Sequence, residues 1–236
     1  FFLRADGEVV GAYVALYSIR NLGGAPVRVC NLAAWCVDDD HRFKGVRLLQ
    51  ALLAQPDLVF VDLSPSGNVI ALNERLGFRQ LDVETSLVTN LPWPVRRRGQ
   101  RVVTDLDEIE ASLTGPALTV FHDHRNTPAV QHVALIDNGR PCHVIFRRVR
   151  RKGVPAFAAV LYVSDQAVFE SMFRRFSHVL LVRHGIPVTL LEHRIGGFRP
   201  GFAPLLPNPR PKMFKGELQP ELLSDDLYSE MVAVPW

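Results

Sequence analysis

A short stretch between a strand-like run and a helix-like run carries the residues best suited to bind an anion. It reads VDDDHRFKGVRLLQALL and extends from Val37 to Leu53. A turn that leads from a strand into a helix presents unpaired backbone N–H groups and the positive end of the helix dipole. Arg42 and Lys44 add positive charge, and Gly45 has no side chain to hold a ligand away from the backbone. The stretch is therefore predicted to be an anion site.

Three aspartates in the same stretch point to a different kind of chemistry. Asp38, Asp39 and Asp40 carry the oxygen atoms that a metal site or a general base uses. Carboxylates are also favoured just before the first turn of a helix, where they end a strand and cap the turn. We expect this second role, with all three side chains in solvent. A contact between one of them and an amine substrate is left open.

Two motifs resemble the GNAT superfamily of acyl-CoA N-acyltransferases. The spacing RFKGVR resembles the Arg/Gln-x-x-Gly-x-Gly/Ala pyrophosphate loop of that family, with matches at Arg42 and Gly45 and a departure at Arg47. The stretch NVIALNERLGF resembles the second motif of the family, an Asn at a strand end followed by a helix that ends in Leu-Gly-Phe. Its matching residues are Asn68, Ala71, Leu72, Leu76, Gly77 and Phe78.

The resemblance implies acetyl-CoA or another acyl-CoA as co-substrate and an amine as acceptor. The acyl-CoA would lie where the strand that ends near Val37 splays from the strand that ends near Leu63. Backbone groups of Trp35 and Val37 would hold the pantetheine and the thioester, amides of residues 43–47 the pyrophosphate, and Asn68 the pantetheine arm. The residues implied to bind the co-substrate are Trp35, Val37, Arg42, Phe43, Lys44, Gly45, Val46, Arg47 and Asn68.

The catalytic residues are harder to match to the family. A Tyr in the second-motif helix often protonates the departing CoA thiolate in GNAT enzymes, but this chain has Asn73 there. Asn donates hydrogen bonds but has no proton to transfer. A thiolate with a reference pKa of about 8.5 is a fair leaving group, so transfer would be slowed rather than abolished. Asn73 and Ser64 are the candidate catalytic residues. Ser64 and Ser66 could relay a proton through water, or else they shape the SPSGN turn.

The periodicity of residues 1–90 predicts the order strand-strand-strand-helix-strand-helix-strand. A hairpin is expected at Asp6-Gly7, and the first helix should end near Gln55. The last strand is assigned to RQLDVETSLVT, after a left-handed stop at Gly77. This order agrees with the core of the GNAT fold. We therefore expect an α/β (α+β) protein with a mixed, mostly antiparallel sheet flanked by helices, whose N-terminal part is missing upstream of Phe1.

The second half repeats the same pattern after a connection at residues 91–115, which contains one short helix, DLDEIEASL. Residues 116–236 begin with three strands joined at Asn138-Gly139 and Lys152-Gly153. A long helix capped by Ser164 and closed by Gly185 follows, and then the strand PVTLLEHR. The apolar stripe of this helix is expected to be Phe169, Met172, Phe173, Phe176 and Leu180. We expect an extended tail over the surface and a last strand in DLYSEMVAVPW. The chain is thus predicted to consist of two structurally related halves.

The second half has no counterpart of the basic glycine turn, because its helix follows AAVLYVSD directly. The resemblance therefore implies a tandem protein whose degenerate second half walls the acceptor pocket. Histidines gather in this half, and His122-x-His124 on one strand face is the pattern closest to a metal site. No ligand pair has the spacing of a zinc site, so no metal is expected.

Composition sets the wider limits. The 236 residues are 47% hydrophobic with a formal charge of +3, and no apolar run is long enough to span a membrane. Three scattered cysteines argue against disulfides and favour the cytoplasm. The basic runs at residues 96–101 and 147–152 lack interleaved aromatics, so a nucleic acid partner is not expected.

Two rival functions are left open. One is a catalytically inactive module that binds CoA or a partner protein, favoured by Asn73 and Arg47. The other is a transferase that uses another acyl donor, such as an aminoacyl-tRNA, with the basic runs on RNA.

Overall fold

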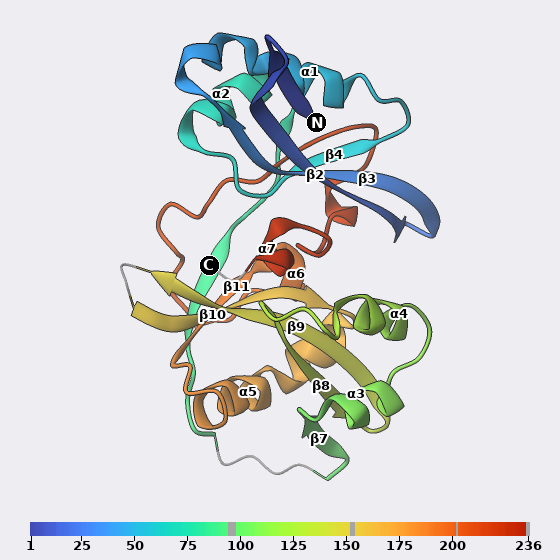
Figure 1. Cartoon of the computed structure of the whole chain (residues 1–236). Coiled ribbons are helices and arrows are strands. Elements are labelled where there is room, and N and C mark those ends of the chain that lie inside the picture. The colour runs from blue at the N-terminus through green and yellow to red at the C-terminus, as the bar shows by residue number, and fades with distance from the viewer. Residues whose placement is uncertain (94–97, 152–153, 202, 235–236) are drawn as a thin grey trace. The chain divides into compact units, whose positions relative to one another are not determined.

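The computed structural model describes residues 1–93, 98–151, 154–201 and 203–234 (Figure 1). The chain divides into two compact units. The first contains Phe1–Asp82, Arg210–Leu223 and Tyr228–Glu230, and the second contains Val83–Pro209, Ser224–Leu227 and Met231–Trp236. The chain thus leaves the first unit after Asp82 and returns to it twice, whereas the sequence patterns suggested a division at residues 1–90, 91–115 and 116–236.

The first unit is built on a sheet with the order β1-β2-β3-β4-β12-β5. Its strands are β1 (Phe2–Ala5), β2 (Glu8–Leu22), β3 (Ala25–Val37), β4 (Val59–Asp62), β5 (Arg79–Gln80) and β12 (Met213–Lys215). The first three are antiparallel neighbours, and β4 runs parallel to β3. The predicted hairpin turn is confirmed, because Asp6 and Gly7 have φ of 51° and 89°.

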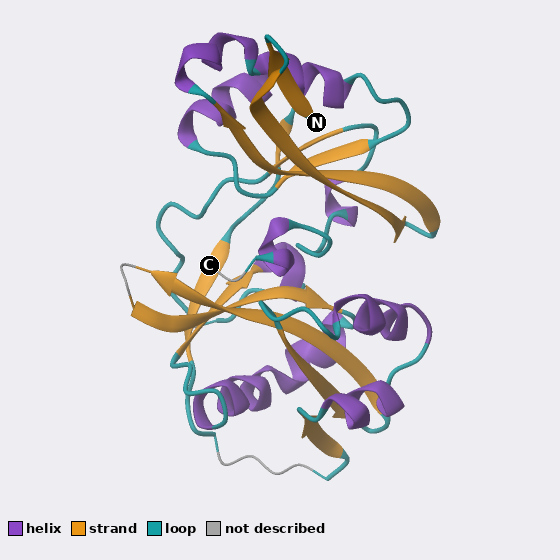
Figure 2. Ribbon diagram, viewed as in Figure 1, coloured by secondary structure: helices purple, strands orange, loops and turns teal. Residues whose placement is uncertain are grey.

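Helices of the first unit connect these strands (Figure 2). The short 3-10 helix η1 (Asp39–Lys44) leads into α1 (Val46–Leu53), and α2 (Gly67–Arg75) follows β4. The leucines of α1 pack into a core with the sheet, as the helical spacing predicted. This core contains Tyr13, Cys30, Leu32, Leu48, Leu49, Leu52, Phe60, Phe78 and Met213. The stop at Gly77 is also confirmed, with φ of 84°.

The second unit is built on a sheet with the order β6-β11-β10-β9-β8-β7. Its strands are β6 (Thr85–Thr89), β7 (Gln100–Val103), β8 (Gln131–Asp137), β9 (Arg140–Arg151), β10 (Val154–Val163) and β11 (Val188–Glu192). The helix α5 (Gln166–Val182) makes the crossover from β10 to the parallel strand β11. The same order of three antiparallel strands, helix and parallel strand occurs in the first unit, at β1–β4.

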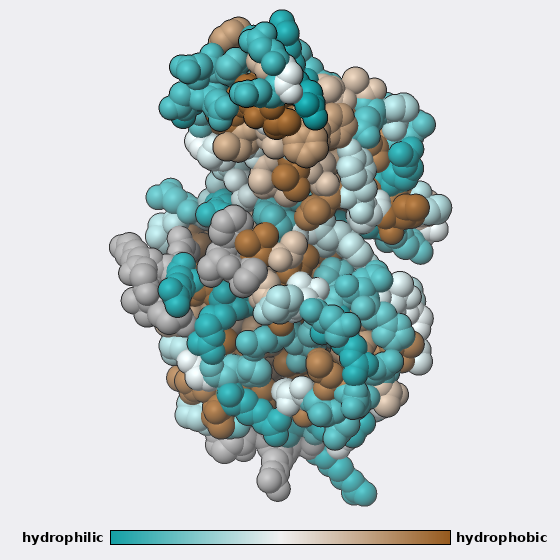
Figure 3. All heavy atoms as spheres, viewed as in Figure 1, coloured by the Kyte–Doolittle hydropathy of each residue, from teal (hydrophilic) through white to brown (hydrophobic). Residues whose placement is uncertain are grey.

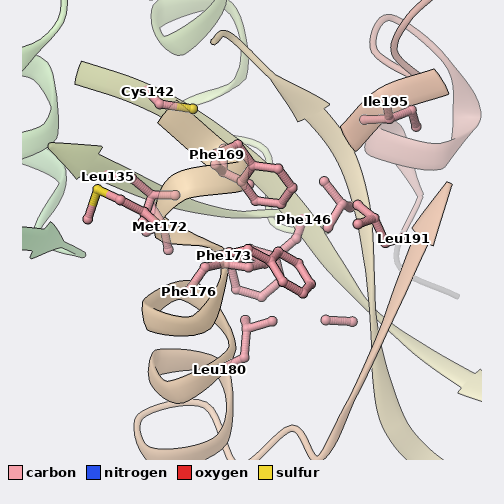
Figure 4. Packing of buried hydrophobic residues seen from close by; sticks show 14 of the residues in the cluster. Leu135, Cys142, Phe146, Phe169, Met172, Phe173, Phe176, Leu180, Leu191 and Ile195 are labelled. Atoms are coloured by element: carbon pink, nitrogen blue, oxygen red, sulfur yellow. The ribbon is translucent and has the colours of Figure 1, made fainter. Parts of the chain in front are cut away.

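The apolar stripe predicted for the long helix is the centre of the core of the second unit. Phe169, Met172, Phe173, Phe176 and Leu180 are all buried, which confirms the prediction. In Figure 4 these residues of α5 lie among Leu135, Cys142, Phe146, Leu191 and Ile195.

Other local expectations for the second unit were wrong. Asp165 rather than Ser164 caps α5, because its carboxylate accepts a hydrogen bond from the Val168 amide at 3.0 Å. His122 and His124 lie on the helix α4 (Gly115–His124) and not on a strand. By contrast, the predicted short helix is confirmed as α3 (Leu106–Ser112). A further short helix, α6 (His193–Gly196), follows β11. The predicted turn at Lys152-Gly153 lies outside the described residues.

Each sheet includes a strand that comes from a distant part of the chain. β12 pairs antiparallel with β4, and β6 pairs antiparallel with β11. The run RQLDVETSLVT is therefore not one strand, because its start forms β5 of the first sheet and its end forms β6 of the second. The predicted surface tail contains β12, whose Met213 and Phe214 are buried. After η2 (Pro220–Leu222), the last described segment forms the helix α7 (Glu230–Ala233) instead of a strand.

Large apolar side chains remain exposed at Phe1 and on the first two strands. They are Phe1, Phe2, Val9, Val14, Tyr17 and Ile19, and Figure 3 shows hydrophobic residues gathered over this part of the first unit. None of the described helices is long and apolar enough to cross a membrane.

Candidate functional site

The parallel pair β3 and β4 separates after three residue pairs. Val29, Cys30 and Asn31 pair with Val59, Phe60 and Val61, and no later pair joins these strands. β3 nevertheless continues as far as Val37, paired only with β2. Residues 32–37 therefore have one strand edge without a strand partner in the described sheet. This separation lies between the strands ending near Val37 and Leu63, where the resemblance implied a splay.

The segment after β3 is more regular than the predicted open turn. Gly45 has helical angles, φ −59° and ψ −37°, and its amide donates to the Arg42 carbonyl at 3.0 Å. A Cβ atom at Gly45 would lie 2.9 Å from Cζ2 of Trp35. Glycine is thus required by the close packing of the helix start on β3. The structure brings Trp35, Val37 and Gly45 together, since the same Cβ would lie 3.2 Å from Val37.

The charged residues predicted for the pyrophosphate lie at the surface. Arg42 forms an exposed ion pair with Asp39 at 2.8 Å. The Phe43 side chain is 76% exposed, and the Lys44 ammonium lies 5.5 Å from the centre of its ring. Arg47 is exposed and Val46 is half-buried. Asp38, before η1, and Asp39 and Asp40, within it, are exposed as expected, but the Asp38 side chain makes no capping hydrogen bond.

Asn68, predicted to bind the pantetheine arm, is exposed in the first turn of α2. Asn73, on the same helix, is fully buried. Its side-chain amide donates to Asp62 Oδ2 at 2.9 Å. The Ser64 backbone amide donates to the other oxygen, Oδ1, at 3.2 Å. Asn73 is therefore a partner of a buried carboxyl group at the end of β4.

A second buried carboxyl group completes this cluster. Glu230 accepts hydrogen bonds of 2.6 Å from the side-chain amide of Asn31 and from the hydroxyl of Ser64. Asp62 and Glu230 are each 4% exposed, and Asn31 is 1% exposed. We call Asn31, Asp62, Ser64, Asn73 and Glu230 the polar cluster. It joins the two residues predicted to be catalytic, Ser64 and Asn73, through two acids that the sequence did not single out.

The position of the polar cluster follows from the sheet. Asn31 is the last residue of β3 that pairs with β4, and Asp62 directly follows its partner Val61. The cluster therefore begins where the two strands separate. Asn31 and Asp62 are polar residues inside apolar strands, a signal that sequence reasoning missed. Nothing local marks Glu230.

Electrostatics of the first unit favour neutral forms beside the cluster. Burial raises the pKa of Asp62 to about 6, and the nearby charge of Glu230 adds to this effect. Burial also raises the pKa of Tyr13, with a further contribution from Asp62. The Tyr13 ring stacks on Trp35, its cross-strand partner, with ring centres 5.6 Å apart.

In the second unit, the strand that corresponds to β3 is β10, and its edge beyond the parallel pairing makes a contact with another segment of the chain. β10 pairs with β11 from Phe157 to Ala159 and then continues to Val163. On this continuation, the Leu161 carbonyl accepts a hydrogen bond from the Asp226 amide at 2.9 Å. The edge is thus contacted by the chain itself.

The histidines form a hydrogen-bonded chain instead of a metal site. His132 and His143 stack with Nδ1 and Nε2 3.0 Å apart. His132 Nε2 donates to the His124 carbonyl at 3.2 Å. His122 is exposed and contacts Glu110 at 3.0 Å. In the part of the chain that the structure describes, no three His, Cys, Asp or Glu side chains form a group that could hold a metal ion.

Three solved structures share this architecture. A GCN5-related N-acetyltransferase from Anabaena variabilis has 14% identity and a TM-score of 0.55, over 90% of this chain and 61% of that chain. A probable N-acyltransferase from Enterococcus faecalis has 12% identity and a TM-score of 0.56, over 89% and 60%. Eis1 from Mycobacterium abscessus has 14% identity and a TM-score of 0.51, over 91% and 63%.

These likenesses show the fold. The chain has the mixed α/β fold of the GNAT acyltransferases, in two units with one sheet each. It spans about three-fifths of the length of the three solved structures. No family model and no curated protein matches the sequence.

Proposed function

We propose that the protein transfers an acyl group, in the first instance acetyl, from acyl-CoA to an amine. The observation that carries the proposal is the separation of β3 from β4 after Asn31, on the strand that leads through η1 to the start of α1. A free strand edge offers backbone groups to an amide-containing chain such as pantetheine. The following helix start offers amides and basic side chains to a pyrophosphate.

The residues proposed to bind the co-substrate divide into two sets. Trp35 and Val37 lie on the free edge of β3 and would contact the pantetheine and the thioester. The side chains of Arg42, Lys44 and Arg47 would contact the phosphates, with Phe43, Gly45, Val46 and Asn68 beside them. The Arg42 guanidinium would exchange its surface ion pair with Asp39 for a phosphate, which carries more charge.

The reaction requires two proton movements. An acceptor ammonium first loses a proton to become a nucleophile, and its nitrogen then attacks the thioester carbonyl. A C–N bond forms and the C–S bond breaks. The nitrogen loses its second proton, and the CoA sulfur gains one, so that an amide, CoA thiol and one free proton result. Asn73 supplies neither proton, and its amide is committed to Asp62.

The second unit is proposed to be the degenerate half of a tandem protein. Two observations support this. Its helix α5 is capped by Asp165, an acid where the first unit has a basic segment. The Leu161 carbonyl on its free strand edge is already hydrogen-bonded to the Asp226 amide.

Calorimetric titration with CoA, acetyl-CoA and longer acyl-CoAs tests the proposal. The variant Lys44→Glu/Arg47→Glu should weaken acetyl-CoA binding by about tenfold or more, because it reverses two charges next to the phosphates. The control Arg28→Glu/Arg101→Glu changes the net charge equally at exposed positions and should bind normally. No binding of any CoA species, or equal losses in both variants, would overturn the proposal.

The alternative function is a catalytically inactive CoA-binding or protein-interaction module. Asn73 favours it, because its side chain is buried and has no proton to transfer to the CoA thiolate. Acetyl-CoA binding without release of CoA thiol, across a panel of amines from pH 6 to about 9, would support the alternative.

A further inference from the structure

The polar cluster carries negative charge without a basic partner. The carboxyl groups of Asp62 and Glu230 are both buried, and their hydrogen-bond donors are neutral groups of Asn31, Ser64 and Asn73. Within the described residues, no Lys, Arg or His forms an ion pair with either acid. A buried acid without a countercharge is costly and favours binding of a positive group.

Two further atoms of the cluster lack partners. Oδ1 of Asn31 and Oδ1 of Asn73 are buried and accept no hydrogen bond. Each belongs to a side chain whose nitrogen donates to Glu230 or Asp62, so both oxygens are part of side chains that are hydrogen-bonded to the acids. The two cluster atoms without a hydrogen-bond partner are therefore both acceptors, and they belong to a cluster that also contains two carboxyl groups.

A protonated primary amine matches this arrangement. It brings one positive charge and three N–H donors, and it accepts nothing. A hard metal ion fits less well, because each of the four carboxyl oxygens already accepts a hydrogen bond and Ca²⁺ or Mg²⁺ needs at least about six oxygen ligands.

We propose that the polar cluster binds the ammonium group of the acceptor, and that the acceptor is an aliphatic amine, cationic at neutral pH. This inference rests on the proposed acyl transfer, because it places the acceptor where β3 and β4 separate. Ser64 is half-buried and is the most exposed member of the cluster. The raised pKa of Asp62 agrees with a missing countercharge, and a bound ammonium would lower it.

Direct binding of three probes tests the inference: benzylamine, which is cationic at pH 7, and aniline and benzyl alcohol, which are neutral. We expect the full chain to bind benzylamine and to bind both neutral probes much more weakly. Asp62→Asn and Glu230→Gln keep the shape of the side chains but remove charge, and should each weaken benzylamine binding by about tenfold or more. Glu74→Gln, an exposed acid on α2, removes the same charge and should change nothing.

Acetyl-CoA titrations of the same samples separate this inference from the proposed function. Two outcomes would overturn the ammonium site alone, provided that acetyl-CoA still binds. One is an unchanged benzylamine affinity in Asp62→Asn and Glu230→Gln, and the other is an affinity for the neutral probes equal to that for benzylamine. Charge-dependent benzylamine binding without acetyl-CoA binding would keep the ammonium site and remove the acyl transfer. Displacement of benzylamine by millimolar CaCl₂ would indicate a metal site instead.

A pH series on the unaltered protein covers the case in which a variant does not fold. Benzylamine binding should weaken as pH falls through about 6, where Asp62 gains its proton, and should release protons in that range. A constant affinity from pH 5 to about 7.5 would contradict the inference.

Discussion

The side-chain amide of Asn31 donates a hydrogen bond of 2.6 Å to the carboxylate of Glu230, which lies 199 positions later in the chain. Ser64 donates to the other oxygen of the same carboxylate at 2.6 Å. One buried acid thus connects β3, the loop after β4 and the start of α7 within the first unit. Because a buried donor without a partner is costly, this contact has consequences for stability.

Replacement of Glu230 by Ala should destabilise the protein. It leaves the buried Asn31 amide without its acceptor, so we expect the free energy of unfolding to fall by about 1–3 kcal/mol. Urea denaturation at pH 7 measures this change. The double variant Asn31→Leu/Glu230→Leu removes both partners. It should lower the free energy of unfolding by less than the sum of the losses in the single variants Asn31→Leu and Glu230→Leu. Losses that add exactly would show that the contact contributes nothing to stability.

Gly45→Ala should destabilise the first unit through overpacking. The new methyl group would lie 2.9 Å from Trp35 Cζ2, and forced repacking costs about 1–3 kcal/mol. Gly67→Ala is the matched control, since nothing lies within 4 Å of its Cβ and it begins α2. That change should be neutral or stabilising by up to about 1 kcal/mol. Equal thermal shifts in the two variants would contradict the packing role of Gly45.

Acidification should destabilise the second unit through its histidine pair. Burial lowers the pKa of His132 to about 4 and that of His143 to about 3, from 6.5. The unfolded chain therefore binds more protons, so the stabilising contribution is complete above pH 6.5 and is lost as pH falls towards 4. Hydrogen exchange of β8 and β9 amides should accelerate in this range. His132→Phe/His143→Leu should flatten the pH dependence, and an unchanged slope would exclude the pair as its cause.

The ionisation of Asp62 should make the first unit less stable as pH rises, which is opposite to the effect of the histidine pair on the second unit. Its pKa is raised from 3.8 to about 6, so the folded state binds more protons than the unfolded chain between these values. Its contribution is fully present below pH 3.8 and is lost as pH rises through 6. Asp62→Asn should therefore increase the free energy of unfolding at pH 7.5, by about 1–3 kcal/mol. A decrease would show that the hydrogen bonds to the carboxylate outweigh its burial.

Replacement of Asn73 by the tyrosine that GNAT enzymes often have at this position should not increase the rate of acyl transfer. Asn73 is fully buried and donates to Asp62, so Asn73→Tyr would overpack the site and remove that hydrogen bond. We expect a loss of about 2–4 kcal/mol in the free energy of unfolding and no gain in the rate of CoA thiol release. A faster rate in a stable variant would mean that this position faces the thiolate.

The sequence alone determined the features that depend on neighbours along the chain. The Asp6-Gly7 hairpin, the left-handed stop at Gly77 and the buried stripe of α5 were all predicted, because turn chemistry and side-chain spacing act within a few residues. The separation of the strands that end near Val37 and Leu63 was implied by the resemblance to the GNAT motifs, and the structure places its start after Asn31.

Only the tertiary structure decided which distant segments complete each sheet and the polar cluster. β6 and β12 are short, and a short strand is assigned by the sheet edge that offers it hydrogen bonds rather than by its own pattern. The partners of Asn31 and Asp62 likewise depend on where the chain returns after about 200 residues. Glu230 has no local signature, because its role comes from the buried donors that it meets.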